Sequence, residues 1–262
     1  MKQLLTVLIL SLCATAWAAK KPAKVDNSVI VVNQSTQQVI LEENADRVRS
    51  MASITKLMTA MVVLDTLPNL DRTIKFSPGY LPRRDYTLRE MLTLLLVRSD
   101  NQAAEVLSKN FHGSRERFID AMNEKAVMLG MLTARFSDPS GVMADNSATA
   151  RDIVKLLVAS GTYPAIRELA GLREVGFETK QGKKFKQVNL TNTNKDILFE
   201  FDNIVVSKTG TTTAAGKCLA MLVEKNGQQY AVILLGDTTK QARDTRARQI
   251  LYTEINREKT VW

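Results

Sequence analysis

Ser53 and Lys56 stand three residues apart, where a run of helical periodicity begins. Residues at positions i and i+3 of a helix share one face, so the Lys56 amine can reach the Ser53 hydroxyl. A lysine becomes a general base for a serine nucleophile when burial and neighbouring cations lower its pKa. A pair of this type is expected about once by chance in a chain of this length. The pair therefore suggests a serine acyl-transfer enzyme, but it needs support from other residues.

A second segment, Ser99-Asp100-Asn101, carries groups that could assist this pair. It follows an apolar run with helical periodicity. A Ser99 hydroxyl at that place can relay a proton between Lys56 and a leaving amine, and the Asn101 amide can hold Lys56 and a substrate carbonyl. On its own, such a tripeptide is more often a loop or a helix cap.

A third segment, Lys208-Thr209-Gly210, comes at the end of a predicted strand. Lys208 and Thr209 supply donors for a carboxylate, and Gly210 lets a substrate backbone lie against the strand edge. All three segments in this order would arise by accident in well under ~1% of chains of average composition. The combination predicts a serine hydrolase where each part alone would not.

The single histidine, His112, limits the alternatives. A Ser-His-Asp triad could use only His112, which lies in a loop-like segment, and we expect it to be an ordinary loop residue. A zinc site built on several histidines is impossible, and cysteine ligands are missing as well. Cys218 lies in an apolar run, so we expect it to be a buried small residue. We therefore expect no metal and no cofactor, and a base other than histidine.

The elements that must position these residues follow from periodicity and turn signals. Two β-branched runs from Ser28 to Leu41 predict a hairpin, and Asn226-Gly227 predicts another near the C-terminus. Helical spacing fills most of the chain between them. The expected helices are one that begins at about Ser53, then 87–97, 114–129, 149–159 and 240–256; the expected later strands are 203–207, 218–224 and 230–235. We expect an α/β (α+β) fold in which an antiparallel sheet joins the first and last elements and an all-helical lobe lies between them.

The N-terminus has the features of a signal peptide. Lys2 supplies the positive region, Leu4 to Leu12 the apolar region, and Ala16-Trp17-Ala18 the small residues of a cleavage site. We expect cleavage near Ala18, which leaves residues 19–262 as one catalytic domain of an exported, periplasmic protein. The formal net charge is +9, with scattered basic residues, so an anionic wall polymer is a more plausible partner than nucleic acid.

The motifs S-x-x-K, S-D-N and K-T-G in this order resemble the penicillin-recognising serine enzymes, which are penicillin-binding proteins and serine β-lactamases. The resemblance extends over nearly the whole mature chain. The segments that carry it are 52–60, 136–141, 147–152, 192–194 and 208–219. The last of these, KTGTTTAAGKCL, is especially similar to the D-alanyl-D-alanine endopeptidase branch of the low-molecular-mass DD-peptidases.

This resemblance implies a DD-peptidase/β-lactamase-like fold: a five-stranded antiparallel sheet flanked by N- and C-terminal helices, plus a helical lobe. It places the sheet lobe at about 25–65 and 200–262 and the helical lobe at about 66–199. It also implies a role for each matching residue. Ser53 would be the nucleophile, Lys56 the proton acceptor, and Ser99 and Asn101 the relay and substrate contacts. Lys208 and Thr209 would bind a substrate carboxylate, the backbone amides of Ser53 and Thr211 would form the oxyanion hole, and Arg243 resembles an arginine near the carboxylate pocket.

The expected substrate is the D-Ala carbonyl of peptidoglycan stem peptides, with β-lactams as covalent inhibitors and at most peripheral membrane contact. An endopeptidase and a carboxypeptidase differ only in the leaving group, which is a cross-linked diamino-acid side chain or free D-alanine. The stretch between Ser53 and Ser99 is shorter than we expect for a carboxypeptidase, and no residues for a second domain follow Trp262. Together with the resemblance, this favours the endopeptidase.

Two other hypotheses remain open at this point. A class A β-lactamase would need an E-x-x-L-N segment between the second and third motifs, and the sequence has none. A non-catalytic β-lactam sensor would keep the fold but usually carries a membrane anchor and a signalling segment, and neither is visible. Rapid penicillin turnover would favour the first hypothesis, and stable acylation without cleavage of any muropeptide the second.

Overall fold

The computed structural model describes residues 27–77, 80–81, 84–110, 113–181 and 184–255. The expected signal peptide and His112 lie outside this part of the chain. The described residues begin with a strand, so an N-terminal helix preceding the sheet would also lie outside it. Within the described ranges, no helix is long and apolar enough to cross a membrane.

A five-stranded antiparallel sheet forms the centre of the molecule, with strand order β2-β1-β11-β10-β9. Its strands are β1 (Ser28–Asn33), β2 (Val39–Glu43), β9 (Ile204–Thr212), β10 (Gly216–Lys225) and β11 (Gln228–Asp237). The first strand pairs with the last, from Ser28 opposite Leu235 to Asn33 opposite Tyr230. The turn between β10 and β11 places Asn226 and Gly227 at φ of 52° and 75°, the left-handed geometry that a two-residue hairpin turn requires. The predicted sheet and both of its hairpins are confirmed.

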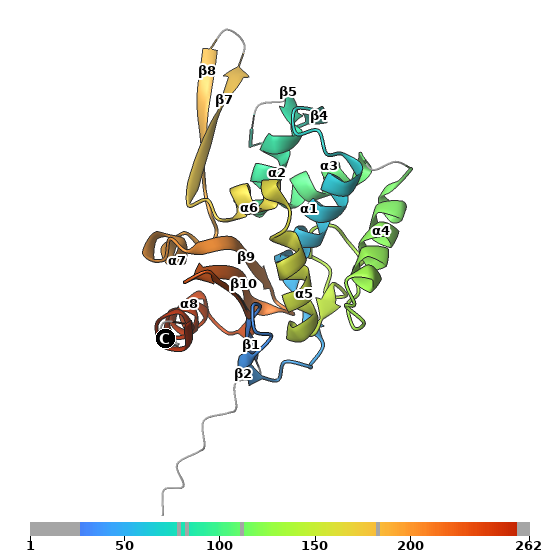
Figure 1. The fold of residues 1–262 in the computed structure, drawn as a ribbon. Coiled ribbons are helices and arrows are strands. Elements are labelled where there is room, and N and C mark those ends of the chain that lie inside the picture. The colour runs from blue at the N-terminus through green and yellow to red at the C-terminus, as the bar shows by residue number, and fades with distance from the viewer. Residues whose placement is uncertain (1–26, 78–79, 82–83, 111–112, 182–183, 256–262) are drawn as a thin grey trace, which may run out of the picture.

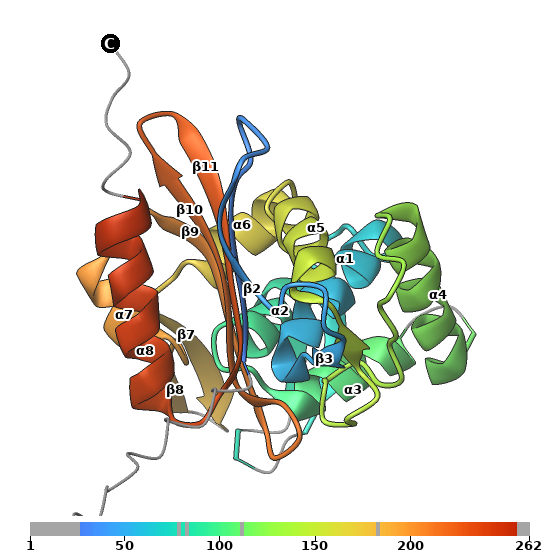
Figure 2. The same ribbon diagram turned by 90° about the horizontal axis from the view of Figure 1, so that it is seen from below.

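The strands β1, β9, β10 and β11 are largely buried, because both faces of the sheet are covered there (Figure 2), whereas the edge strand β2 is mostly exposed. Ile30 and Ile233 belong to the core beneath the helical lobe, whereas Val29 and Leu234 belong to the core beneath the C-terminal helix. The covering helices on this second face are α7 (Lys195–Glu200), α8 (Lys240–Gln249) and the π-helix Ile250–Ile255. The predicted C-terminal helix therefore continues as a π-helix after Gln249.

The helical lobe is built around α1, whose residues from Thr55 to Val63 are all buried. The expected boundary at about residue 65 places this helix in the sheet lobe instead. Its helices are α1 (Thr55–Thr66), α2 (Leu88–Leu96), α3 (Asn101–Lys109), α4 (Arg115–Met128), α5 (Ala150–Ser160) and α6 (Pro164–Ala170). Thr87, Ser114 and Thr149 accept hydrogen bonds as the N-caps of α2, α4 and α5. These caps lie at the first residues of the helices predicted over 87–97, 114–129 and 149–159.

The lobe also contains strands outside the predicted ranges, although strand character is expected again after about Gly182. Three two-stranded sheets form: β3 (Arg49–Ser50) with β6 (Ser147–Ala148), β4 (Thr73–Phe76) with β5 (Arg84–Thr87), and β7 (Glu174–Gln181) with β8 (Lys184–Thr191). The β7–β8 hairpin projects from the body of the molecule (Figure 1). In β7, Val175 and Phe177 pack against the core and alternate with exposed residues, so only one face of this strand is apolar.

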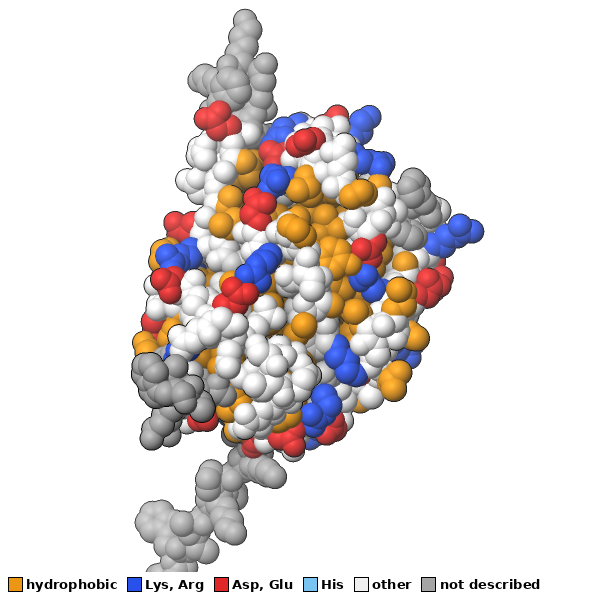
Figure 3. Space-filling model, viewed as in Figure 1, with side chains coloured by type: hydrophobic (Ala, Val, Ile, Leu, Met, Phe, Trp, Pro, Cys, Tyr) orange, Lys and Arg blue, Asp and Glu red, His pale blue; other side chains and the backbone are white. Residues whose placement is uncertain are grey.

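Charged side chains of both signs are mixed on the face shown in Figure 3, and the basic residues form no single patch there. This agrees with the scattered basic residues of the sequence. Cys218 is buried in the sheet, and burial raises the pKa of its thiol to about 11. It is a packing residue, as expected.

Candidate active site

Ser53 lies in a 3-10 turn, Ala52–Ile54, that leads directly into α1. Ala52 has a φ of 47°, an uncommon conformation for a residue other than glycine. Two glycines hold this turn. A Cβ atom at Gly141 would lie 1.9 Å from the Ala52 carbonyl oxygen, and one at Gly210 would lie 3.1 Å from the Ser53 backbone nitrogen. The strand β9 therefore lies directly against the nucleophile segment, and only glycine permits that approach.

The Lys56 side chain is fully buried beneath Ser53. Its Nζ atom lies 2.9 Å from Ser53 Oγ, 2.7 Å from Asn101 Oδ1 and 2.6 Å from the Ser140 carbonyl oxygen. The i, i+3 spacing thus brings lysine and serine together as the sequence predicted. Asn101 reaches them because α3 begins at this residue. The contact with Ser140 was not predicted, because a backbone carbonyl leaves no signal in the residue types.

Burial lowers the pKa of the Lys56 amine to about 7, although the charges of Asp138 and Asp100 raise it. Desolvation disfavours the charged ammonium more than the two carboxylates favour it. A substantial fraction of Lys56 is therefore neutral near pH 7, as a general base must be.

The Ser140 carbonyl is held in place by Asp138. This buried carboxylate accepts hydrogen bonds from the Ser140 amide at 2.6 Å, the Gly141 amide at 2.8 Å and the Met143 amide at 2.9 Å. Burial alone would raise the pKa of Asp138, but the Ser140 hydroxyl and the three amides lower it overall. The carboxylate of Asp138 thus holds the loop whose Ser140 carbonyl accepts a hydrogen bond from Lys56.

Lys208 is a second buried lysine near the cleft. Its Nζ atom donates to Ser99 Oγ at 2.8 Å and to the Thr209 carbonyl oxygen at 3.0 Å. Burial lowers the pKa of Lys208 well below its ordinary value, and the charges of Lys56 and Arg243 lower it further. Ser99 adopts a φ of 61° and is bonded to Lys208. A hydrogen bond from Lys56 to Ser99, which a direct proton relay would use, is not among those of the described residues.

Above these lysines lies an open cleft of about 290 Å³. Its lining includes five residues expected from the sequence to be near the nucleophile or the carboxylate: Ser99, Asn101, Thr209, Thr211 and Arg243, together with Ser53 itself. Thr193, Lys217 and Lys240 line it as well. The Thr209 hydroxyl donates to the Thr193 hydroxyl at 2.6 Å. Thr193 belongs to a segment that resembled the family pattern, but no role was predicted for it.

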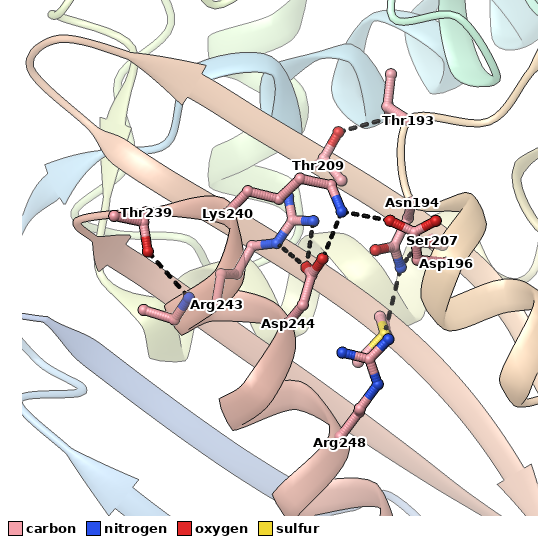
Figure 4. Close-up of polar contacts among 12 residues, drawn as sticks. Thr193, Asn194, Asp196, Ser207, Thr209, Thr239, Lys240, Arg243, Asp244 and Arg248 are labelled. Atoms are coloured by element: carbon pink, nitrogen blue, oxygen red, sulfur yellow. Dashed lines mark hydrogen bonds and ion pairs between the residues drawn. The ribbon is translucent and has the colours of Figure 1, made fainter.

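The first turn of α8 forms one end of this cleft (Figure 4). Arg243 is buried there and pairs with Asp244, at 2.8 Å from its Nε atom. Lys240 pairs with the same Asp244 at 2.6 Å and with Asp196 of α7 at 2.5 Å. The structure therefore places Arg243 in the lining of the cleft, where it forms an ion pair with Asp244.

The described residues contain no group of three or more His, Cys, Asp or Glu side chains that could hold a metal ion. What they do bring together is a hydroxyl, an amine whose pKa is lowered to about 7, and a group of cationic side chains at one cleft. This set can perform acyl transfer on a substrate that carries a carboxylate.

Comparisons with known proteins also identify a class of acyl-transfer enzyme. The sequence profile of a family described as D-alanyl-D-alanine carboxypeptidase matches residues 15–239. A D-alanyl-D-alanine endopeptidase of Escherichia coli is 37% identical over 85% of this chain and 74% of its own length. Another, from Pseudomonas aeruginosa, is 37% identical over 95% of this chain and 87% of its own length. The crystal structure of a Streptomyces DD-transpeptidase superimposes with a TM-score of 0.82 at 25% identity, over 90% of this chain and 99% of that one.

Proposed function

The chain belongs to the D-alanyl-D-alanine carboxypeptidase family and is a hydrolase of the DD-peptidase class. Within this class, we propose that it is an endopeptidase. It would cleave D-Ala cross-links between peptidoglycan stem peptides through an acyl-enzyme on Ser53. Relatives named as endopeptidases, at 37% identity over most of the chain, support this choice of leaving group. The family description, D-alanyl-D-alanine carboxypeptidase, supports the alternative leaving group, free D-alanine.

The observation that carries the proposed acyl-enzyme on Ser53 is the set of three hydrogen-bonding contacts of Lys56. A neutral amine has two N–H donors and one lone pair. Asn101 Oδ1 and the Ser140 carbonyl oxygen can only accept hydrogen bonds, so they take the two donors. The lone pair then faces the remaining neighbour, Ser53 Oγ, 2.9 Å away. This arrangement leaves Lys56 ready to accept the hydroxyl proton.

In the proposed acylation, the Ser53 Oγ–H proton moves to Lys56 as Oγ bonds to the D-Ala carbonyl carbon. The backbone amides of Ser53 and Thr211 would stabilise the oxyanion, at about 3 kcal/mol for each donor. The carbonyl C–N bond then breaks, and the leaving amine receives the proton that Lys56 took from Ser53. Ser99 would relay this proton only after its hydroxyl turns from Lys208 toward Lys56. Water later attacks the ester by the reverse proton route and releases the peptide from Ser53.

The cationic pocket would orient the substrate. An ammonium group has three donors, and Lys208 uses two of them, on Ser99 and on the Thr209 carbonyl. The third, together with the Thr209 hydroxyl and Arg243, would bind the carboxylate of the leaving residue. The same groups would bind the carboxylate of a penicillin and lead to stable acylation of Ser53. The signal-peptide features of residues 1–18 support export to the periplasm, where this substrate lies.

The test is digestion of purified muropeptides, with a cross-linked dimer and an uncross-linked pentapeptide as separate substrates. We expect cleavage of the dimer into its two stem peptides. Release of D-alanine from the pentapeptide while the dimer persists would assign the carboxypeptidase activity instead. Ser53→Ala should lose both activities and covalent labelling by a fluorescent penicillin, while circular dichroism stays unchanged. Labelling that persists in this variant would refute the nucleophile.

A further inference from the structure

Lys217 lines the cleft from the beginning of β10, and none of the functions assigned above uses it. Its partner across the β9–β10 ladder is Thr211. Directly opposed residues of an antiparallel pair project from the same face of the sheet. Thr209 lies two residues before Thr211 and shares this face by the alternation of the strand. Lys217 therefore extends the row of cleft-lining side chains that begins at the carboxylate pocket.

The neighbouring cations of the cleft, Lys240 and Arg243, form ion pairs with carboxylates, and among the described residues Lys217 differs from them in this respect. Lys240 is paired with Asp196 and Asp244, and Arg243 with Asp244 (Figure 4). Within the described ranges, the Lys217 amine has no hydrogen bond or ion pair. The side chain is only half-buried, so it is open to a ligand in the cleft. A cation in this state at the wall of a cleft favours an anionic group of a ligand.

The proposed reaction determines which anionic group could reach it. Free D-alanine as the leaving group brings one carboxylate, and the pocket at Lys208 and Thr209 already accounts for that one. A cross-linked substrate brings a whole second stem peptide as its leaving group, with further carboxylates of its own. These extend beyond the linking residue and so beyond the first carboxylate pocket.

We propose that Lys217 binds a carboxylate of this second stem peptide and thereby selects cross-linked over uncross-linked substrate. The inference rests on the proposed endopeptidase function. We assign Lys217 no part in the acylation chemistry, because it forms no hydrogen bond with Ser53 or Lys56 among the described residues. Its effect is on binding of the leaving strand, and it acts only on substrates that have one.

The size of the effect follows from the exposure of the group. A charge-assisted contact between half-exposed partners is weaker than a buried one. We expect loss of the charge to lower kcat/KM for a cross-linked dimer about tenfold, a factor typical of one such contact. Salt should reduce this difference, since partly exposed charges are screened.

The experiment compares Lys217→Gln and Lys217→Arg in the full chain on three substrates. These are a cross-linked dimer, the same dimer with the carboxylates of its leaving strand amidated outside the linking residue, and a penicillin. We expect Lys217→Gln to lose about tenfold on the free dimer and less than about twofold on the amidated dimer and in penicillin acylation. Lys217→Arg should retain most activity on every substrate. Lys109→Gln, at an exposed lysine of α3, is the control for loss of charge alone.

Several outcomes would overturn the inference. Equal losses on the free and amidated dimers would assign Lys217 a structural role, and an unchanged Lys217→Gln variant would assign it none. Both results leave the endopeptidase function intact, because the wild-type protein still cleaves the dimer. A wild-type protein that releases D-alanine but leaves the dimer uncut would overturn the proposed function and this inference together.

Discussion

Lys56 and Lys208 are both buried at the same cleft, but their neighbours carry opposite charges. Lys56 has the carboxylates of Asp138 and Asp100 close by, and these raise its pKa against the effect of burial. Lys208 has the cations Lys56 and Arg243 close by, and these lower its pKa together with burial. The same side chain is thus placed in two different electrostatic environments within one site.

The difference suggests how the two lysines divide the work. Carboxylates near Lys56 partly offset the loss of solvation, so its pKa falls to about 7 and the amine can both accept and return a proton. Among the described residues, no carboxylate raises the pKa of Lys208 in this way, so a ligand can supply the negative charge that its surroundings do not. We therefore interpret Lys56 as the base and Lys208 as an anion receptor that is completed by the substrate.

Replacing each lysine by arginine should separate these roles most sharply. An arginine keeps the positive charge but does not deprotonate in proteins. Lys56→Arg should therefore lower the rate of penicillin acylation about 1,000-fold, within the range for loss of a general base. Stopped-flow labelling with a fluorescent penicillin measures this rate, and circular dichroism checks the fold. Acylation within about tenfold of wild type would contradict a base role.

The pH dependence of acylation should follow the neutral fraction of Lys56. That fraction rises with pH and levels off above a pKa of about 7. The second-order rate of acylation should thus fall about tenfold for each pH unit below 7, or about 100-fold at pH 5. The lowered pKa of Lys208 should end the plateau before the ordinary range of lysine, since a neutral Lys208 no longer attracts a carboxylate. A rate independent of pH between 5 and 8 would rule out Lys56 as the group that titrates.

Lys208 should respond in the opposite way to the arginine replacement. Lys208→Arg keeps a cation and should retain most binding of a carboxylated peptide, whereas Lys208→Ala should lose about 30-fold. Because a bound anion raises the pKa of Lys208, binding above neutral pH should take up a proton. Calorimetry of the Ser53→Ala protein in buffers of different ionisation enthalpy measures that uptake. Equal losses with carboxylated and amidated peptides would show that Lys208 is no anion receptor.

The residues of this comparison could be predicted from the sequence, but their environments could not. The spacing of Ser53 and Lys56 on one helix face is a local property, and local geometry follows from periodicity. The approach of Asn101 depends on where α3 begins, which the chain marks only with an ordinary cap at Asp100. The Ser140 carbonyl has no side-chain signal at all. It is positioned by a loop that folds around a single carboxylate, Asp138.

The fold shows the same limit. Most strands of the central sheet are runs of apolar residues, and the hairpin turn at Asn226-Gly227 has a strong sequence signal. The β7–β8 hairpin has only a few apolar residues, such as Val175 and Phe177, which pack against the lobe at one end. Its pairing over eight residues in each strand depends on main-chain hydrogen bonds that any sequence can form. A helix beginning at a threonine cap is visible in the sequence, and such a hairpin is not.

The smallest expected effect concerns the carboxylates that distinguish Lys56 from Lys208. Asp100 caps α3 by accepting from the Ala103 amide at 2.8 Å, and asparagine caps a helix about equally well. Asp100→Asn should thus keep the helix but remove a charge that raises the pKa of Lys56. The rising limb of the acylation profile should move to lower pH, with Asp120→Asn, an exposed position on α4, as the control. A shift to higher pH, or an equal shift in both variants, would mean that nearby carboxylates do not set the pKa of this lysine, and the contrast with Lys208 would then rest on burial alone.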